Sequence, residues 1–151
     1  MKILMVCLGN ICRSPLAEGI LKHKCEQQNL DWEIDSAGTG KWHIGSQPDK
    51  RSIEVAKKYG IDISQQKART VNSNDYEYYN LIYAMDKSNE SDLLAWALDN
   101  KEAQKIKLIM SEIDTKNPES VPDPYWNDNG FELVFKMLDE ACDKIIEKYK
   151  K

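Results

Sequence analysis

The stretch MVCLGNICRSP, residues 5–15, decides how this chain is organised. It completes a short apolar run, places Cys7 directly after it, and brings a second cysteine, Cys12, five residues later, just before Arg-Ser-Pro. A continuous apolar run of this length is typical of a strand buried on both faces, and Pro15 stands where a helix can begin. The stretch therefore predicts a strand, a tight loop and a helix, with Cys7 at the end of the strand.

The loop at residues 8–13 has the features of an anion-binding site. Gly9 can adopt backbone angles that other residues resist, and a loop that wraps a helix N-terminus directs N–H groups and the helix dipole at one point. Cys7 would lie at the base of that cradle, where the same field stabilises a thiolate. Arg13 adds a planar fork suited to phosphate oxygens. The loop therefore predicts phosphoryl transfer with Cys7 as the nucleophile.

Each of these residues also has a simpler interpretation when it is considered alone. Cys7 could be a buried strand cysteine, Ser14 a helix cap and Arg13 a surface charge. The pattern Cys-x5-Arg-Ser between a strand and a helix is far more specific, and it favours the functional interpretation. Cys25 and Cys142 lie on apolar helical faces, so we interpret both as core residues.

A proton donor for the leaving group is the second requirement, because such a group typically contributes roughly 10²–10⁴ in rate. The strongest candidate is Asp123, which two prolines flank in SVPDPYWND, residues 120–128, and prolines restrict the backbone around it. Tyr125 and Trp126 would form an aromatic rim. The aperiodic segment 111–129 is long for a connecting loop, as functional loops often are. From this segment alone, an ordinary Asp-Pro turn remains the simpler interpretation.

The composition fits one domain, residues 1–151, with a substantial core. The net charge is −4 and the 21 lysines and arginines form no dense block, which argues against a nucleic-acid or membrane partner. No apolar run approaches the roughly 18 residues of a membrane-spanning helix, and no signal peptide is recognisable, so we expect a cytoplasmic protein. Four cysteines are too few for a secreted disulfide scaffold, and their spacing does not suit zinc.

Strand and helix patterns alternate along the whole chain. Strands are predicted at 3–6, 32–40, 79–86 and 105–110, and helices from Pro15, from Pro48 to Gly60, at 93–98 and at 131–145. This alternation predicts an α/β fold, a three-layer open sheet of four parallel strands with helices on both faces. Ligands bind beyond the carboxyl ends of the strands in such sheets, and Cys7 lies at one of these ends.

Two motifs, CLGNICRSPLAE and the distant DPYW, resemble the low-molecular-weight protein tyrosine phosphatases. The resemblance extends through DSAGTGKWHIG, PDKRSIEVAKKYGIDIS and YAMDKSN to the final helix. It implies a flavodoxin-like phosphatase I fold and hydrolysis of phosphotyrosine and small aryl phosphates through a phosphocysteine on Cys7. Asp123 is implied as the acid that protonates the leaving phenol and then as the base for the attacking water.

The resemblance also assigns the phosphate-binding loop to Leu8, Gly9, Asn10, Ile11, Cys12, Arg13 and Ser14. Asn10 is implied to hold the loop in shape, and Ser14 to hydrogen-bond the Cys7 sulfur. Cys12 is implied as a redox partner that forms a disulfide with Cys7 under oxidation, with simple loop packing as the alternative.

Residues outside the loop are assigned by the same resemblance. Trp42 and Tyr125 are implied to wall the mouth of the pocket, and Ser36 and Asp86 to support it. Gln66 departs from the family pattern, because many relatives have a histidine of the loop-support network there. Trp126 also departs, replacing a second tyrosine that is common in animal members.

The implied partners are phosphotyrosine proteins, a tyrosine kinase that supplies them, and phosphate or a similar oxyanion in the active site. We expect a monomer that needs no metal or organic cofactor.

A thioredoxin-coupled arsenate reductase on this fold would need further cysteines near the third strand, and LIYAMDKSNESDLLAW contains none. A phosphocysteine phosphocarrier would not need Asp123, and the intact set of Cys7, Arg13 and Asp123 argues against a non-enzymatic phosphate-binding module with a dormant thiol. We interpret Tyr76, Tyr78 and Tyr79 as packing and rim positions.

Overall fold

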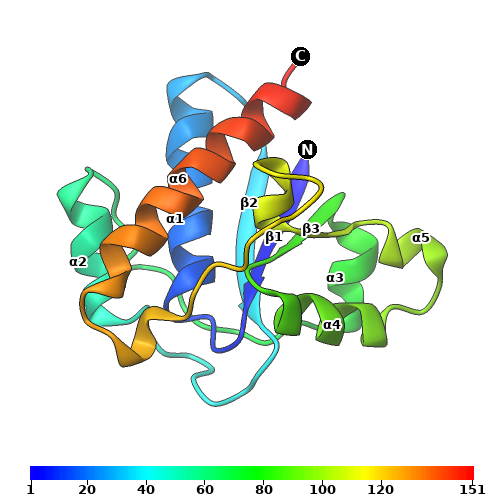
Figure 1. The fold of residues 1–151 in the computed structure, drawn as a ribbon, viewed down its shortest axis with the longest axis horizontal. Coiled ribbons are helices and arrows are strands. Elements are labelled where there is room, and N and C mark those ends of the chain that lie inside the picture. The colour runs from blue at the N-terminus through cyan, green and yellow to red at the C-terminus, as the bar shows by residue number, and fades with distance from the viewer.

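Four parallel strands form a single sheet in the computed structural model, which describes residues 1–151 (Figure 1). They are β1 (Lys2–Cys7), β2 (Glu33–Gly38), β3 (Leu81–Ala84) and β4 (Ile106–Leu108), in the order β2-β1-β3-β4. The central strand β1 ends where Cys7 pairs with Gly38 of β2 and Val6 pairs with Ala84 of β3. The predicted parallel sheet of four strands is confirmed.

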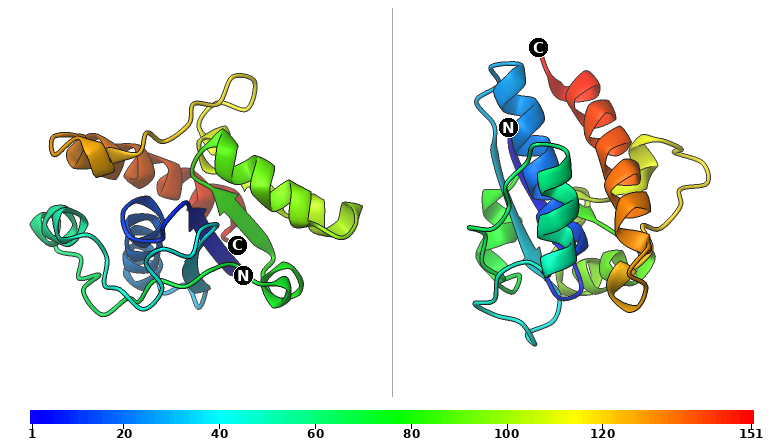
Figure 2. Two further views of the ribbon diagram at one scale, coloured as in Figure 1. Left: turned by 90° about the horizontal axis from the view of Figure 1, so that it is seen from below. Right: turned by 90° about the vertical axis from the view of Figure 1, so that its left-hand side faces the viewer.

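Helices cover both faces of this sheet, as Figure 2 shows from two further directions. One face carries α1 (Arg13–Gln27), α2 (Lys50–Lys58) and α6 (Gly130–Tyr149), and the other carries α3 (Ser73–Tyr78) and α4 (Lys87–Trp96). The chain also forms a short helix α5 (Asn100–Ala103) and two 3₁₀ turns, η1 (Ile109–Glu112) and η2 (Pro124–Trp126). None of the helices combines the length and apolar character needed to cross a membrane.

The apolar run of β1 serves two cores at once. Successive side chains of a strand point to opposite faces, so Ile3 and Met5 join the larger core beneath α1 and α6, while Leu4 and Val6 join the smaller core beneath α4. All four side chains are fully buried. Because both faces are covered from Ile3 onwards, β1 has to be apolar at each of these positions, and this is why the run is continuous.

Two predicted helix starts differ from those in the structure, one by two residues and one by six. The first helix begins at Arg13, two residues before Pro15, and the helix predicted at 93–98 spans Lys87–Trp96. The second difference has a clear cause. The Asp86 side chain accepts the backbone N–H of Asn89, and the Asn89 side chain accepts that of Asp86. This capping box starts α4 directly after β3.

Other predicted boundaries also shift. The fourth strand stops at Leu108, where η1 begins, rather than at 110. Two helices were not predicted, and both start at an acidic or amide cap: Asn72 with Asp75 caps α3, and Asp99 caps α5. Because they are only one to two turns long, they leave no clear 3.6-residue period in the sequence.

The three clustered tyrosines divide between core and rim. Tyr76 and Tyr79 are buried in the smaller core, whereas Tyr78 is exposed and its hydroxyl donates to Glu33. Cys25 and Cys142 are both buried in the larger core. The interpretation of all five residues as packing or rim positions is confirmed.

Candidate active site

Cys7 ends β1 at the base of a loop whose backbone N–H groups are free. The sulfur is buried, with 2% of the residue exposed, and residues 8–12 connect it to the start of α1. No backbone N–H of residues 8–12 donates a hydrogen bond to another protein group. Unpaired amides around a helix N-terminus form a binding site for an anion. The loop therefore presents its donors to a ligand rather than to the protein.

Asn10 holds this loop in shape from behind. Its backbone is in the left-handed region, with φ of 57°, which asparagine tolerates better than most residues. Its amide nitrogen donates to Ser14 Oγ at 2.8 Å and to Ser36 Oγ at 3.0 Å, while its oxygen accepts the backbone N–H of Arg69 at 3.0 Å. Ser14 Oγ in turn lies 3.0 Å from the Cys7 sulfur. The expected contacts of Asn10 and Ser14 are present.

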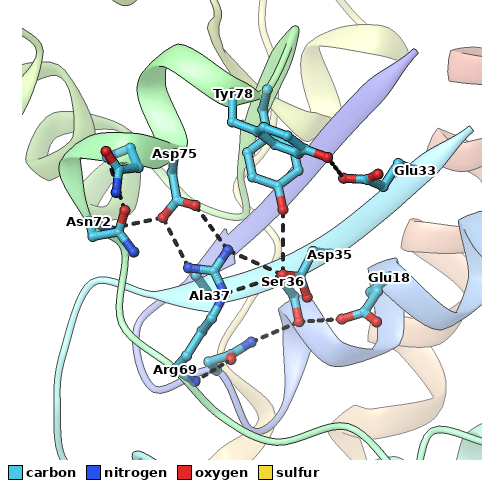
Figure 3. Close-up of polar contacts among 12 residues, drawn as sticks. Glu18, Glu33, Asp35, Ser36, Ala37, Arg69, Asn72, Asp75 and Tyr78 are labelled. Carbon is cyan, nitrogen blue, oxygen red and sulfur yellow. Dashed lines mark hydrogen bonds and ion pairs between the residues drawn. The ribbon is translucent and has the colours of Figure 1, made fainter.

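Glu18 and Arg69 hold this network, Glu18 through its carboxyl and Arg69 through its backbone N–H (Figure 3). Ser36 Oγ donates to the buried Glu18 at 2.6 Å, and burial raises the pKa of that carboxyl above its ordinary value although Lys22 and Ser36 oppose the shift. The Arg69 guanidinium donates to both oxygens of Asp75 at 3.0 Å and to Asp35 at 3.2 Å. Sequence reasoning missed Arg69 and Asp75, because only the fold brings residue 69 beside the loop.

Arg13 is held rigidly and keeps its charge. Its Nη1 donates to Asp86 at 2.6 Å and to the Val121 carbonyl at 2.9 Å, and its side chain is 3% exposed. Burial alone would lower the pKa of this guanidinium, but the Cys7 sulfur and the Asp86 carboxylate raise it above its ordinary value. A planar guanidinium fixed in this way is suited to bind phosphate oxygens in one orientation.

The second cysteine of the loop, Cys12, is buried near a carboxylate. Burial, with a further contribution from Asp49, raises the pKa of the Cys12 thiol to about 12. Cys12 therefore remains a protonated thiol at neutral pH, and its carbonyl accepts the Ser52 hydroxyl at 3.2 Å. A disulfide between Cys7 and Cys12 stays a prediction.

Asp123 lies at the open side of the same pocket. Its Oδ2 is 3.9 Å from Arg13 Nη2, and its Oδ1 accepts the backbone N–H of Tyr125 at 3.1 Å. The side chain is 38% exposed, so it is open to solvent and to a ligand in the pocket. The two prolines place Asp123 as the cap of η2. The structure thus brings together residues more than one hundred positions apart in the sequence.

The pocket around these groups has a volume of about 360 Å³. Its lining consists of Cys7, Leu8, Gly9, Ile11, Cys12, Arg13, Trp42, His43, Asp123, Tyr125 and Trp126. Asn10 and Ser14 are absent from the lining because their side chains support the loop from behind. Trp42 and Trp126 stand at the mouth and are 74% and 86% exposed. His43 was not predicted as a lining residue, although it directly follows Trp42 in the sequence.

Gln66, one of the departures from the family pattern, does not join the loop-support network. Its amide nitrogen donates to the Pro15 carbonyl at 3.1 Å, and its oxygen is buried without a partner. Glu18 pairs with Lys22, one turn further along α1, at 2.6 Å. Gln66 therefore contacts α1 and none of the residues that support the loop.

Known proteins share both the sequence and the architecture. A family model described as low molecular weight phosphotyrosine protein phosphatase matches residues 2–151. A putative low molecular weight protein-tyrosine-phosphatase of Synechocystis sp. is 40% identical over 149 residues, covering 97% of this chain and 94% of that protein. A crystal structure of a protein tyrosine phosphatase from Entamoeba histolytica aligns with a TM-score of 0.91 and 38% identity, covering 98% of this chain and 96% of that chain.

A further solved structure, described as a Drosophila arginine phosphatase, aligns with a TM-score of 0.93 and 36% identity, covering 100% of this chain and 99% of that chain. All of these similarities extend over nearly the full length, and they include the loop and the segment that carries Asp123. The chain belongs to the low molecular weight phosphotyrosine protein phosphatase family, a family of hydrolases.

Proposed function

We propose that residues 1–151 form a single catalytic domain that hydrolyses phosphotyrosine through a phosphocysteine on Cys7. The thiolate attacks phosphorus, so that an S–P bond forms as the ester P–O bond breaks, and Asp123 gives its proton to the leaving phenol oxygen. Water then attacks the phosphocysteine, Asp123 takes the proton from that water, and phosphate leaves as the thiolate re-forms. Hydrolysis of the phosphocysteine thus returns Cys7 to the thiolate and Asp123 to the protonated acid.

One observation supports this mechanism above all others. One pocket is lined by Cys7, by the loop residues Leu8, Gly9, Ile11 and Cys12 with their free amides, and by Arg13 and Asp123. The amides and Arg13 can stabilise the negative charge of the equatorial oxygens, which is the main task in phosphoryl transfer. Ser14 Oγ, at 3.0 Å, can stabilise the Cys7 thiolate when it re-forms.

The walls of the pocket favour an aromatic leaving group. Ile11, Trp42 and Tyr125 present apolar and aromatic surface on which a phenyl ring can stack. The Drosophila relative is described as an arginine phosphatase. A phosphoarginine side chain would find one carboxylate in this pocket, Asp123, and that group is already assigned to proton transfer. We therefore propose aryl phosphates as the substrate class and phosphoarginine as the comparison substrate.

The remaining parts of the proposal concern the cellular setting. We propose phosphotyrosine proteins made by a tyrosine kinase as substrates and a monomer as the active form. A nucleophilic thiol has to stay reduced, which favours the cytoplasm. A phosphocarrier is a weaker candidate, because Asp123 lies in the pocket as an acid that such a protein would not use.

The first experiment follows p-nitrophenol and inorganic phosphate together during hydrolysis of p-nitrophenyl phosphate under reducing conditions. We expect both products to appear at the same steady rate over many turnovers. A single burst of nitrophenol with phosphate retained on the protein would indicate a phosphocarrier instead.

Cys7→Ser is expected to abolish turnover while inorganic phosphate still binds; appreciable residual hydrolysis would exclude Cys7 as the nucleophile. Phosphotyrosine and phosphoarginine peptides then test the substrate class.

The role of Asp123 is tested by its leaving-group dependence. Asp123→Asn keeps an oxygen that can accept the Tyr125 N–H but cannot donate a proton as an acid, so we expect hydrolysis of poor leaving groups to fall by roughly 10²–10⁴. The loss is expected to be smaller for p-nitrophenyl phosphate, whose phenolate leaves readily. An equal loss for every leaving group would show that Asp123 is not the acid.

A further inference from the structure

Arg51, in the first turn of α2, joins the two segments that build the pocket. The backbone N–H of Asp49 donates to the Ile11 carbonyl at 2.7 Å, which ties the start of α2 to the phosphate-binding loop. The Asp49 carboxylate then accepts from Arg51 Nε at 3.0 Å and from Nη2 at 2.9 Å. These two hydrogen bonds fix the orientation of the guanidinium. They also lower the pKa of Asp49 below its ordinary value.

The remaining nitrogen of Arg51 reaches the segment that carries Asp123. We call residues 122–129 the acid loop. Arg51 Nη1 lies 2.5 Å from Asp128 Oδ1. The guanidinium carbon also lies 5.5 Å from the centre of the Tyr125 ring and 4.6 Å from that of Phe131, at the start of α6. Such cation–π contacts add to the ion pair.

The acid loop has few other polar attachments. Within it, the Asp123 carboxyl caps Tyr125, and short turn bonds connect Asn127 with Pro124 and Asn129. Only two polar contacts connect its residues with the rest of the molecule beyond the adjoining start of α6: the 3.9 Å approach of Arg13 to Asp123, and the Arg51–Asp128 pair. The first is longer than a hydrogen bond. Arg51 therefore makes the closer of the two.

We propose that Arg51 is a positioning residue, which holds the acid loop over the phosphate-binding loop so that Asp123 stays within reach of the leaving-group oxygen. This inference rests on the proposed function. Arg51 is not among the residues that line the pocket, so it acts through Asp128 and Tyr125 rather than on the substrate.

Two variants test the contact without disturbing the nucleophile. Asp128→Asn removes the charge of the exposed partner and leaves the Asp49 cap of α2 intact, whereas Arg51→Met removes the whole contact. Lys58→Met is the matched control: it removes the 2.5 Å pair between Lys58 and Glu132, which joins the same helix to α6 outside the acid loop. All three are compared with the wild type over aryl phosphates of increasing phenol pKa.

We expect kcat/KM of Arg51→Met to fall roughly tenfold for the poorest leaving group and far less for p-nitrophenyl phosphate, because a misplaced catalytic group loses rate steeply. Asp128→Asn is expected to change in the same direction by a smaller factor. The inhibition constant of inorganic phosphate should stay at the wild-type value in both, since the phosphate-binding loop is not altered. Lys58→Met should match the wild type throughout.

The outcomes separate this inference from the proposed function. If the wild type and Lys58→Met turn over and both acid-loop variants keep the wild-type leaving-group dependence, the role of Arg51 is refuted. An equal loss for all substrates, or a large loss of phosphate affinity, would likewise overturn it in favour of a general structural role. If the wild type itself releases no phosphate, the proposed function fails first. Should Arg51→Met unfold, Asp128→Asn decides the question.

Discussion

At the scale of single residues, Cys7 and Cys12 show how one loop can treat two thiols differently. Cys7 opens into the pocket beneath the free amides and lies 3.0 Å from the Ser14 hydroxyl. Cys12 lines the same pocket and is about as buried as Cys7, and burial, with a further contribution from the Asp49 carboxylate, raises its pKa to about 12. Thiolates, and not thiols, are the reactive form. The second thiol of the loop, Cys12, therefore stays protonated at neutral pH.

Selective alkylation follows from this difference. With a pKa of about 12, the thiolate fraction of Cys12 at neutral pH is about 10⁻⁵, so iodoacetamide is expected to label Cys7 first. Inorganic phosphate should protect Cys7 by filling the loop. Peptide mass mapping measures both, with the buried Cys25, whose pKa is raised to about 11 by burial, as the internal control. Labelling of Cys12 as fast as that of Cys7 would contradict the prediction.

At the scale of elements, the end of β2 has to approach the phosphate-binding loop closely. Thr39 and Gly40 donate their backbone N–H groups to Cys7 and Leu8 at 2.9 and 2.8 Å. A Cβ atom on Gly38 would lie 2.7 Å from the Leu8 carbonyl oxygen, and that atom belongs to the backbone of the loop. The shape of the loop thus depends on a residue without a side chain in the neighbouring strand.

Gly38→Ala is therefore expected to weaken phosphate binding and to cost about 1–3 kcal/mol of stability, as overpacking typically does. Gly60→Ala is the matched control, because Gly60 has φ of 80° and nothing within 4 Å of its Cβ position. The control should lose about 1–2 kcal/mol through backbone strain alone and keep the phosphate affinity. Urea unfolding and phosphate inhibition measure the two effects. Unchanged phosphate affinity in Gly38→Ala would refute the prediction.

At the scale of the whole molecule, the burial of Glu18 that lets it accept Ser36 also reduces the stability of the fold once the carboxyl is ionised. This carboxyl is buried between α1 and β2 to receive Ser36, and burial raises its pKa above the ordinary value. A carboxyl whose pKa is raised in the folded protein binds protons more readily there than in the unfolded chain. Stability contributed by this group is therefore lost as pH rises above its ordinary pKa.

Glu18→Gln, which does not titrate, should consequently gain stability relative to the wild type as pH rises above the ordinary pKa of glutamate. Glu132→Gln is the control of opposite sign, because hydrogen bonds from Lys58 and Tyr59 lower the pKa of Glu132. That variant should lose stability relative to the wild type as pH rises towards the ordinary pKa of glutamate. Urea unfolding at several pH values gives both slopes, and parallel slopes for the two variants would contradict the assignment.

The parts of the fold that could be predicted were those with strong local patterns. The run at 3–6 and the periodic positions of the last helix identified β1 and α6, because a strand and a long amphipathic helix each leave a clear period. The short helices α3 and α5 were missed for the same reason, although Asn72 with Asp75 is a capping signal that points to α3.

The sequence by itself determined the parallel sheet, the loop after β1 and the residues Cys7, Arg13 and Asp123, because local patterns and one recognisable motif encode them. Only the tertiary structure decided how these residues meet. It placed Asp123 3.9 Å from Arg13, Arg69 behind Asn10, and Arg51 between the two sides of the pocket. These contacts join segments tens of residues apart, and no local period records them. They depend on the strand order β2-β1-β3-β4, which brings distant loops to one edge of the sheet.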